Sequence, residues 1–363
     1  MQKYSLRCSI CDTTQSNNSI SNIFCDLNCK ALLYCDDVSK NKINPIESIK
    51  NSINSISLGE GNTPLVKLEK IGEKLGLDKL FAKLEFMSPT GSFKDRGSAL
   101  VMNVAKNEKV KEFVEDSSGN AGASLSAYAA AANIKAHIFV PDSAGKGKLD
   151  QISIFGAELH KISGPRENST IEAKKFSKKN DIPYISHNLS PYFSEGMKSF
   201  AYEIFNELKT IDHIIFPTGN GSLLLGTWRG YKDISELHKN NFPKLHVAQS
   251  KNIEPIVSKL NNKKWHFDID KKTLASGISV SNPPRIDEII QAVRFTKGEG
   301  ISSTDEEALI WHDILAKEEG IFSEITCAFV FPALEKLIKD KKIKKDETIL
   351  LPITGSGLKE PIL

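Results

Sequence analysis

One lysine of this chain stands in a setting that favours reactivity. It lies in "SPTGSFKDRG" (residues 88–97), where a proline and a glycine interrupt regular structure before Lys94. Ser92 and Asp95 have the spacing of a capping box, which predicts a helix that starts at Phe93. Lys94 would then lie in the first turn, where the positive end of the helix dipole lowers an amine pKa and favours nucleophilic or basic chemistry. A solvated lysine in an ordinary capping turn is the open alternative.

A second segment, "PTGNGSLLLG" (217–226), has the composition of an anion-binding turn. A glycine-rich turn before a helix offers free backbone N–H groups and the helix dipole to a phosphate. No Gly-Lys-Ser/Thr follows, so it is not a Walker A loop, and Gly226 comes too late for a dinucleotide fingerprint. The next strand segment ends in Gln249 and Ser250 rather than in the acid that would hold a ribose. We therefore expect a lone phosphate monoester rather than NAD, with a plain tight turn as the alternative.

Two more loops, "SSGNAG" (117–122) and "LPITGSGLK" (351–359), follow apolar segments. If the strands before these loops are parallel, the loops open on one crevice, which is where α/β sheets bind ligands. A placed lysine, a loop with Asn120 and a phosphate-binding turn favour a cofactor that carries both an aldehyde and a phosphate. Pyridoxal phosphate (PLP) has both groups.

Five of the six cysteines lie within the first 35 residues, and Cys327 stands apart as an expected core residue. The first four form the pairs C-x2-C and C-x3-C, which are Cys8, Cys11, Cys25 and Cys29. Two closely spaced thiol pairs can close a tetrahedral site, so we expect a small ribbon with a structural zinc ion. The second pair is one residue wider than usual, and Cys35 could replace Cys29. Reduced thiols without metal are the alternative.

The bulk composition is that of an ordinary enzyme-sized protein. Charged residues make up 26% and hydrophobic residues 40% of the 363 residues. The net charge of +3 is too mild to indicate a nucleic acid or an anionic membrane as partner. No run approaches the length of a membrane span, and the first residues lack a signal-peptide core, so we expect a cytoplasmic location.

The elements that must position these loops alternate along the chain. Strands are predicted at 80–86, 111–116, 136–141, 158–163, 183–188, 213–216 and 244–250. Helices are predicted from Phe93 onward and at 121–133, 145–156, 169–180 and 195–208. Residues 36–57 are polar and are interpreted as a linker. The alternation predicts α/β layers with parallel sheets.

Four segments, in this order, resemble the threonine synthase branch of the tryptophan-synthase-like, fold-type II PLP enzymes. They are "SPTGSFKDRG", "SSGNAGASLSAYAA", "PTGNGSLLLG" and "ITGSGLK". "SLGEGNTPLVKL" (57–68) resembles the opening of that fold, and "EEGIFSEITCAFVFPALEKL" (318–337) resembles its late segment. The cysteine pairs resemble the zinc-ribbon-like start of some threonine synthases. The resemblance covers nearly the whole chain.

This resemblance implies two doubly wound α/β domains, preceded by a small zinc-ribbon-like N-terminal segment. Residues 1–57 would form the Cys-rich segment and linker, and residues 58–363 the PLP-dependent catalytic region. Within that region, 58–93 and 190–363 would form the large cofactor domain, and about 94–189 the smaller substrate domain.

The resemblance also implies roles for individual residues. Lys94 matches the lysine that forms the internal Schiff base and shuttles protons, and Asn120 matches the asparagine that hydrogen-bonds the PLP phenolic oxygen. Ser118 and Gly119 match the region that holds the substrate carboxylate. Thr354 matches the hydroxyl residue beside the pyridine nitrogen, which suits elimination and replacement. The phosphate-binding turn would comprise Gly219, Asn220, Gly221, Ser222 and Leu223.

The chain departs from the family pattern in "SHNLSPYFSEGMKS" (186–199). Many threonine synthases have an arginine here that grips the phosphate of O-phosphohomoserine, and Phe193 stands in its place. An apolar ring cannot bind a dianion. Arg96 is then a candidate substrate ligand, with a helix-surface salt bridge as the alternative. Ser356 stands where many relatives have histidine.

The implied function is that of a PLP-dependent threonine synthase-type lyase, which converts O-phosphohomoserine and water into threonine and phosphate. A serine/threonine dehydratase and a synthase that forms cysteine or cysteate by β-replacement are the alternatives. The missing ribose acid disfavours a nicotinamide oxidoreductase, and the mild charge disfavours a zinc-ribbon binding module. We expect a small amino-acid substrate, no nucleic-acid or membrane partner, and a homodimer by family analogy.

Overall fold

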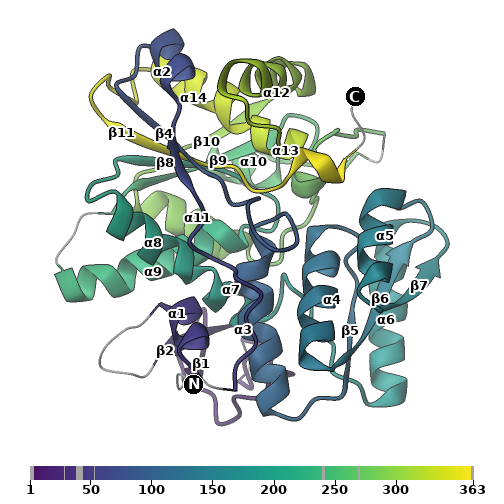
Figure 1. The fold of residues 1–363 in the computed structure, drawn as a ribbon. Coiled ribbons are helices and arrows are strands. Elements are labelled where there is room, and N and C mark those ends of the chain that lie inside the picture. Colours follow the sequence, from purple (N-terminus) through teal and green to yellow (C-terminus); the bar gives the residue numbers. More distant parts are fainter. Residues whose placement is uncertain are drawn as a thin grey trace. The chain divides into compact units, whose positions relative to one another are not determined.

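The computed structural model describes residues 4–27, 29–37, 44–52, 54–238, 242–268 and 270–360. The chain divides into two compact units, which are drawn in Figure 1. Unit 1 comprises Met1–Gly61 and Ser88–Ser199, and unit 2 comprises Asn62–Met87 and Phe200–Leu363. The Cys-rich segment is therefore part of unit 1. The domain limits expected from the sequence stay a prediction.

Unit 1 begins with a two-stranded antiparallel sheet of β1 (Tyr4–Cys8) and β2 (Leu33–Asp37). Helix α1 (Pro45–Lys50) follows, and the Asn44 side chain caps it by accepting the N–H of Ile46. The linker predicted for 36–57 is therefore wrong in part. Polar composition hid the helix, but Ile46 and Ile49 are three residues apart and both are buried.

The main sheet of unit 1 has three parallel strands in the order β5-β6-β7. The strands are β5 (Glu112–Glu115), β6 (Lys135–Pro141) and β7 (Glu158–Ile162). The helices of this region are α3 (Lys94–Asn107), α4 (Asn120–Ala132), α5 (Lys146–Ile154) and α6 (Arg166–Asn180). These seven elements confirm the alternation predicted from the sequence.

Two predictions between residues 183 and 208 are wrong. The expected strand at 183–188 is only an isolated bridge between Val114 and Tyr184, because the chain turns at Ser186. The expected helix at 195–208 is divided into α7 (Pro191–Gly196) and α8 (Lys198–Glu207). A Cβ on Gly196 would lie 2.3 Å from the Arg96 carbonyl oxygen, so the glycine allows α7 to approach α3 closely.

Unit 2 contains a six-stranded sheet in the order β10-β9-β8-β11-β4-β3, parallel except for the β3–β4 pair. Its strands are β3 (Leu65–Lys67), β4 (Lys79–Lys83), β8 (His213–Pro217), β9 (Lys244–Ser250), β10 (Gly300–Ser303) and β11 (Thr348–Pro352). Its helices include α2 (Glu69–Leu75), α9 (Ser222–His238), α10 (Pro255–Leu260), α11 (Ile286–Phe295), α12 (Asp305–Glu319), α13 (Ile325–Ala328) and α14 (Val330–Lys339), with 3-10 turns η1 (Ser276–Ile278) and η2 (Gly357–Lys359). The expected α/β architecture with parallel sheets is confirmed.

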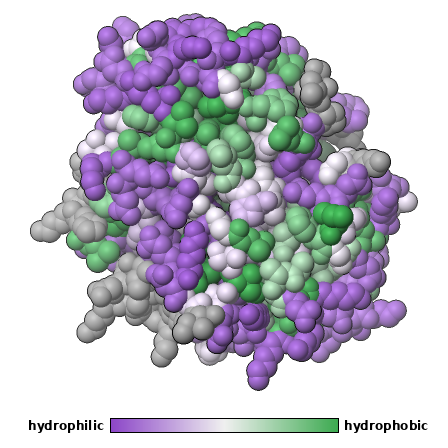
Figure 2. All heavy atoms as spheres, viewed as in Figure 1, coloured by the Kyte–Doolittle hydropathy of each residue, from purple (hydrophilic) through white to green (hydrophobic). Residues whose placement is uncertain are grey.

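The core of unit 2 is built from apolar side chains of its central strands and of α12 and α14. Leu80, Ile215 and Leu351 represent the strands in this cluster, and Leu315 and Leu334 represent the helices. Figure 2 shows that the surface over α2 and α12 is mainly hydrophilic, as expected for helices with one buried face. Among the described residues, no helix is both long and apolar enough to cross a membrane.

Candidate active site

Lys94 is the first residue of α3, and its Nζ lies 3.9 Å from the centre of the Phe93 ring. The helix therefore starts within one residue of the predicted position. The predicted capping box is wrong, because no side chain caps this helix. The Asp95 carboxylate instead accepts the N–H of Thr90 at 2.8 Å and its hydroxyl at 2.6 Å. These two bonds hold the loop before Lys94 against the first turn of α3.

The same carboxylate connects α3 to α4. The Ser124 hydroxyl of α4 donates to Asp95 Oδ1 at 2.6 Å, and it lies 2.7 Å from the hydroxyl of Ser98 on α3. Ser92 is buried, and its hydroxyl has no hydrogen-bond partner among the described residues. The turn at Lys94 is thus fixed by side chains, with one buried hydroxyl beside it that a ligand could satisfy.

The loop 117–119 leads from β5 into α4 and is tightly folded. A Cβ on Gly122 would lie 2.0 Å from the Ser117 carbonyl oxygen, so only glycine fits there. A Cβ on Gly119 would meet nothing within 4 Å, so there is open space at the start of α4. Ser118, Gly119 and Asn120 are half-buried at this helix N-terminus, where free N–H groups favour a carboxylate.

Sequence reasoning missed a buried acid at the end of β5. His187 Nδ1 lies 2.7 Å from Glu115 Oε1, and the His187 backbone N–H donates to Oε2 at 3.1 Å. Burial raises the pKa of Glu115 well above its usual range, and the Asp116 charge adds to this effect. Burial, with the nearby charges of Lys94 and Arg166, lowers the pKa of His187 well below its usual range. Both shifts favour the uncharged forms of this hydrogen-bonded pair, which lies near the charge of Lys94. The sequence signal that could have identified Glu115 is an acidic residue at the end of an apolar strand.

Arg96, the predicted substrate ligand, and Phe193, which stands in place of the family's arginine, both lie in the interior of unit 1. The Arg96 side chain is fully buried and donates to the Ser199 hydroxyl at 2.9 Å. Phe193 is also fully buried, and a Cβ on Gly97 would lie 2.7 Å from its ring. Its ring meets that of His187 edge to face, with 5.9 Å between centres. Phe193 is thus a packing residue between α7 and α3.

In unit 2, the glycine-rich turn joins β8 to α9. Gly221 has a φ of +74°, and a Cβ there would lie 2.3 Å from Cδ1 of Ile289. A Cβ on Gly219 would lie 2.8 Å from the Gly277 carbonyl oxygen. Ser222 begins α9, so the first N–H groups of that helix have no intrahelical acceptor. The Asn220 side-chain oxygen is buried and has no hydrogen-bond partner among the described residues.

Thr354 follows β11, which is the neighbour of β8 in the same sheet. Its hydroxyl lies 3.4 Å from Cys327 Sγ, which also accepts the N–H groups of Thr354 at 3.2 Å and Gly355 at 3.3 Å. Burial raises the pKa of Cys327 to about 11, so the thiol is neutral. Thr326 Oγ1 accepts the Gly277 N–H at 3.1 Å, which continues the chain of contacts to Gly219. Unit 2 thus brings Thr354 and the glycine-rich turn together. Cys327 is buried in the core of unit 2 as predicted, and sequence reasoning missed only its contact with Thr354.

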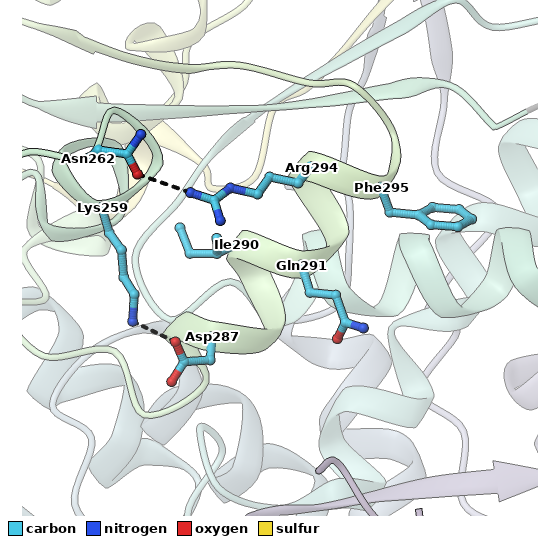
Figure 3. A pocket seen from close by; sticks show the side chains of 7 residues that line it. All are labelled: Lys259, Asn262, Asp287, Ile290, Gln291, Arg294 and Phe295. Carbon is cyan, nitrogen blue, oxygen red and sulfur yellow. Dashed lines mark hydrogen bonds and ion pairs between the residues drawn. The ribbon is translucent and has the colours of Figure 1, made fainter.

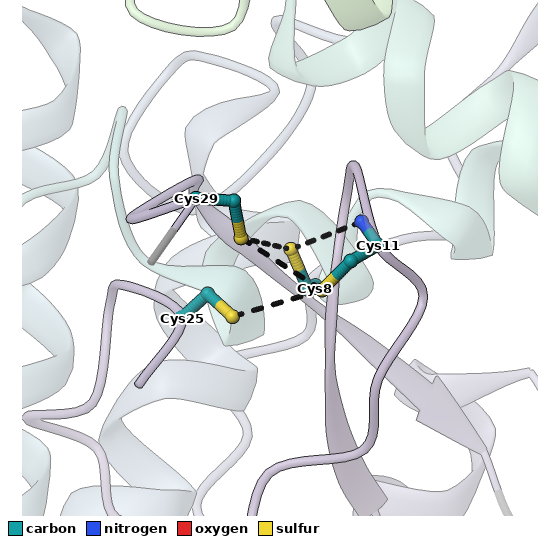
Figure 4. Close-up of side chains that lie close together, drawn as sticks. All are labelled: Cys8, Cys11, Cys25 and Cys29. Atoms are coloured by element: carbon teal, nitrogen blue, oxygen red, sulfur yellow. Dashed lines mark hydrogen bonds between the residues drawn. The ribbon is translucent and has the colours of Figure 1, made fainter. Parts of the chain in front are cut away.

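The four cysteines predicted to bind metal converge in the N-terminal segment (Figure 4). The Sγ atoms lie 3.5 Å apart for Cys8 and Cys29, 3.9 Å for Cys11 and Cys25, and 3.7 Å for Cys11 and Cys29. A tetrahedral zinc site with Zn–S bonds near 2.3 Å separates its sulfur atoms by about 3.8 Å. Cys35 lies in β2 and is not part of this group.

A surface pocket on α10 and α11 does not contain any of the predicted site residues (Figure 3). Lys259 lies 2.5 Å from Asp287, and Arg294 lies 3.3 Å from the Asn262 side-chain oxygen. Four of its five polar side chains therefore form two pairs, and we assign no function to the pocket. Its lining residues are Lys259, Asn262, Asp287, Ile290, Gln291, Arg294 and Phe295.

Comparisons with known proteins agree on one family. Residues 56–355 match the family model described as "Pyridoxal-phosphate dependent enzyme". The chain is 32% identical to a threonine synthase of Halalkalibacterium halodurans, over 84% of this chain and 85% of that protein. It is 31% identical to a threonine synthase of Methanosarcina acetivorans, over 99% of this chain and 93% of that protein.

Among solved structures, maize serine racemase matches with a TM-score of 0.74 and 21% identity, over 86% of this chain and 93% of that one. At this identity the match shows a common fold alone. The matched residues 56–355 include every residue predicted above to bind PLP. The chain belongs to the family of pyridoxal-phosphate dependent enzymes.

Proposed function

We propose that this protein is a threonine synthase, which converts O-phosphohomoserine and water into threonine and phosphate. The observation that carries this proposal is the 31–32% identity to threonine synthases of a bacterium and an archaeon over most of each chain. The substrate is accordingly a small phosphorylated amino acid. By family analogy we also propose a cytoplasmic homodimer.

The residues of unit 2 fit the phosphate of PLP. Gly219 and Gly221 keep the turn free of side chains that would collide with its neighbours, and the start of α9 supplies N–H groups and a favourable dipole. The Asn220 side-chain NH2 group can donate to a phosphate oxygen, whereas its buried oxygen needs a donor. We propose that Gly219, Asn220, Gly221, Ser222 and Leu223 bind the cofactor phosphate.

When bound, PLP supplies an electron sink that makes the Cα proton of an amino acid acidic. We propose that Lys94 attaches the cofactor covalently and moves protons at the substrate carbons. Asn120 would hold the phenolic oxygen of the cofactor, and the start of α4 at Ser118 and Gly119 would bind the substrate carboxylate. Cys327 would orient the Thr354 hydroxyl, which would serve the pyridine nitrogen of the cofactor.

The phosphate of the substrate needs a separate ligand. We propose Arg96 for this role, because charge-assisted hydrogen bonds are the strong way to bind a dianion. Arg96 would exchange its bond to Ser199 for one to the substrate. His187 cannot supply a charge, since its pKa is well below its usual range. Loss of a charged hydrogen-bond partner at a phosphate costs about 2–3 kcal/mol of binding free energy. Arg96→Ala should therefore raise KM for O-phosphohomoserine about 30- to 150-fold and leave PLP binding intact.

A second candidate function is that of a serine/threonine dehydratase or a β-replacement synthase. Phe193 favours it, because this buried apolar ring stands where the phosphate-binding arginine is expected. A product assay separates the candidates. The purified protein is offered O-phosphohomoserine, serine and threonine in turn, and phosphate, threonine, pyruvate and 2-oxobutyrate are measured. Phosphate and threonine from the first substrate support our proposal, whereas keto acids alone would replace it with the second candidate.

We further propose that Cys8, Cys11, Cys25 and Cys29 bind one structural zinc ion, supported by sulfur separations that match a tetrahedral site. Protein purified without chelator should contain about one tightly held zinc ion per chain. Four freely titratable thiols in protein that lacks zinc would contradict this. Cys8 and Cys25 are as buried as Cys35, so the reactivity of the two exposed thiols, Cys11 and Cys29, reports whether zinc is bound.

A further inference from the structure

Two histidines and a glutamate converge on adjacent strands of unit 1. In the parallel pair β6–β7, His137 lies opposite Glu158, and Phe139 lies opposite His160. Because side chains two residues apart share one face of a strand, His137, Glu158 and His160 are neighbours on the same face. The Phe176 ring of α6 packs on this face, 5.0 Å from the His137 ring and 5.1 Å from the His160 ring. The two imidazoles are therefore held in place by packing.

The distances among the ligand atoms are those of a coordination site. His137 Nδ1 lies 3.2 Å from His160 Nε2, and it lies 3.6 Å from a Glu158 carboxylate oxygen. His160 Nε2 lies 3.6 Å from the other oxygen of Glu158. A tetrahedral ion with bonds of 2.0–2.1 Å separates its ligand atoms by about 3.3 Å. Two ring nitrogens and one carboxylate group at these separations surround a position that one ion can occupy.

A fourth residue orients the first ligand. His137 Nε2 lies 2.8 Å from a carboxylate oxygen of Glu112, the first residue of β5. A neutral imidazole that donates its Nε2–H to this carboxylate has its lone pair on Nδ1, which faces His160 and Glu158. Metal-binding histidines commonly donate their other N–H to a carboxylate in this way, and the arrangement fixes the tautomer.

A second histidine pair, in unit 2, differs from this one in the partners of its ring nitrogens. In unit 2, His213 Nδ1 lies 2.9 Å from His246 Nε2, and His213 Nε2 lies 3.2 Å from Glu347. His246 Nδ1 accepts the backbone N–H of Glu299 at 3.0 Å. Every ring nitrogen of that pair therefore has a protein partner, and both rings are buried. In unit 1, Glu158 supplies an extra carboxylate from the half-exposed side of the cluster.

Without a metal, Glu158 pairs with Lys135 at 2.9 Å. Both side chains are about half exposed, at 49% and 52%. An ion pair of this kind contributes little to stability, so a metal ion can displace it easily.

We propose that His137, His160 and Glu158 bind a divalent transition metal ion of the imidazole-preferring class that includes Zn²⁺, with Glu112 as a positioning residue. Water completes the coordination, since three protein ligands leave one tetrahedral position open. The cluster includes the first residue of β7 and residues near the starts of β5 and β6, whereas Ser118 and Asn120 follow the other end of β5. The site is therefore separate from the loop proposed to bind substrate, and it does not depend on the proposed function.

The test is a zinc titration of the full-length protein by isothermal calorimetry. Each protein is first reduced, given one equivalent of zinc for the cysteine cluster and desalted, so that the cysteines contribute equally in all variants. Wild type should then bind one further Zn²⁺ per chain. His160→Gln should lose this binding, whereas the exposed His266→Gln should retain it and serves as the matched control.

Two further variants keep the test decisive if His160→Gln folds poorly. Glu158→Gln changes only a half-exposed side chain and should weaken zinc binding at least tenfold with unchanged circular dichroism. Glu112→Gln should weaken it by about 10- to 100-fold without changing the stoichiometry, as expected when the partner of a metal-binding histidine is lost. The proposal is overturned if wild type binds no further zinc, or if Glu158→Gln and His266→Gln bind it as tightly as wild type.

Discussion

The turn before Lys94 in unit 1 and the turn before Ser222 in unit 2 both lead a loop into the N-terminus of a helix, but they are held by different means. The first is held by the Asp95 carboxylate, which accepts three hydrogen bonds from Thr90 and Ser124. The second is held by close backbone packing, in which Gly221 lies against Ile289.

The difference follows from what each turn has to present. A reacting amine must be placed at one point, and rigid side-chain hydrogen bonds around a buried carboxylate provide that placement. An anion needs several N–H groups pointing into an empty space, and only glycine leaves that space empty while it adopts a positive φ. Loss of a side chain should therefore damage the first turn, whereas gain of one should damage the second.

The largest effect is expected from removal of the reacting group itself. Lys94→Ala should lower the rate of product formation by at least about 10³-fold, because proton transfer by a positioned group contributes 10²–10⁴-fold and the covalent attachment is also lost. Borohydride reduction of wild type should fix PLP on the Lys94 peptide. Lys106→Ala, on the exposed face of the same helix, should keep both the label and the activity. A label on another lysine in wild type would reject the assignment.

Asp95→Asn should weaken the first turn through loss of its buried carboxylate. An amide cannot accept all three donors, and hydrogen bonds to a charged group contribute about 1.5–3 kcal/mol each. We expect the free energy of opening α3 and α4 to fall by about 3 kcal/mol, measured as faster amide hydrogen exchange in residues 90–105. Asp150→Asn, on the exposed side of α5, should leave exchange unchanged. Equal protection in both variants would show that Asp95 does not hold this turn.

The sequence predicted both turns because each signal is local. Small residues beside a helix-forming segment identify a turn within ten residues, and the alternation of apolar segments identified most strands. The capping box failed because Asp95 takes Thr90 as its partner rather than the backbone at Ser92. Which of these two partners the Asp95 carboxylate takes depends on the folded backbone and is not visible in residue spacing.

Long-range pairs could not be predicted in the same way. His187 and Glu115 are 72 residues apart, and Cys327 and Thr354 are 27 residues apart. Each of these residues looks like an ordinary polar or core residue within its own segment. The folded chain places the His187 loop beside the end of β5 and Cys327 of α13 beside the residues that follow β11, so these contacts emerge from tertiary structure rather than from motifs.

Gly221→Ala should damage the second turn by adding a side chain. A positive φ costs an L-residue about 1–2 kcal/mol, and the new Cβ would also collide with Ile289, which adds about 1 kcal/mol of overpacking. Gly76→Ala is the matched control, since Gly76 has a similar φ of +69° and a Cβ there would meet nothing within 4 Å. We expect unfolding free energies lower by about 2–3 kcal/mol for Gly221→Ala and by about 1–2 kcal/mol for Gly76→Ala, and weaker PLP binding only for Gly221→Ala. If the two variants bind PLP equally well, close packing at Gly221 is not what shapes the turn.

The smallest effect concerns the strand that carries the second turn. β8 begins at His213, which is hydrogen-bonded to His246 of β9, and burial lowers the pKa of His246 to about 3. His246 therefore binds a proton near pH 6.5 in the unfolded chain, whereas in the folded chain it stays unprotonated at this pH. The stability that this group contributes is present above pH 6.5 and is lost as the pH falls toward 3.

Between pH 6.5 and 5.5, we expect unit 2 to lose about 1 kcal/mol of unfolding free energy from this group. Urea unfolding followed by tryptophan fluorescence measures it, because Trp228, Trp265 and Trp311 all belong to unit 2 and the signal does not include His187 of unit 1. Loss of charge on Glu347, whose pKa is lowered, acts in the same direction at lower pH. His246→Gln removes the titrating group and should flatten the pH dependence by about 1 kcal/mol over this interval. If the unfolding free energy of this variant falls with pH as steeply as that of wild type, groups other than His246 destabilise unit 2 in acid.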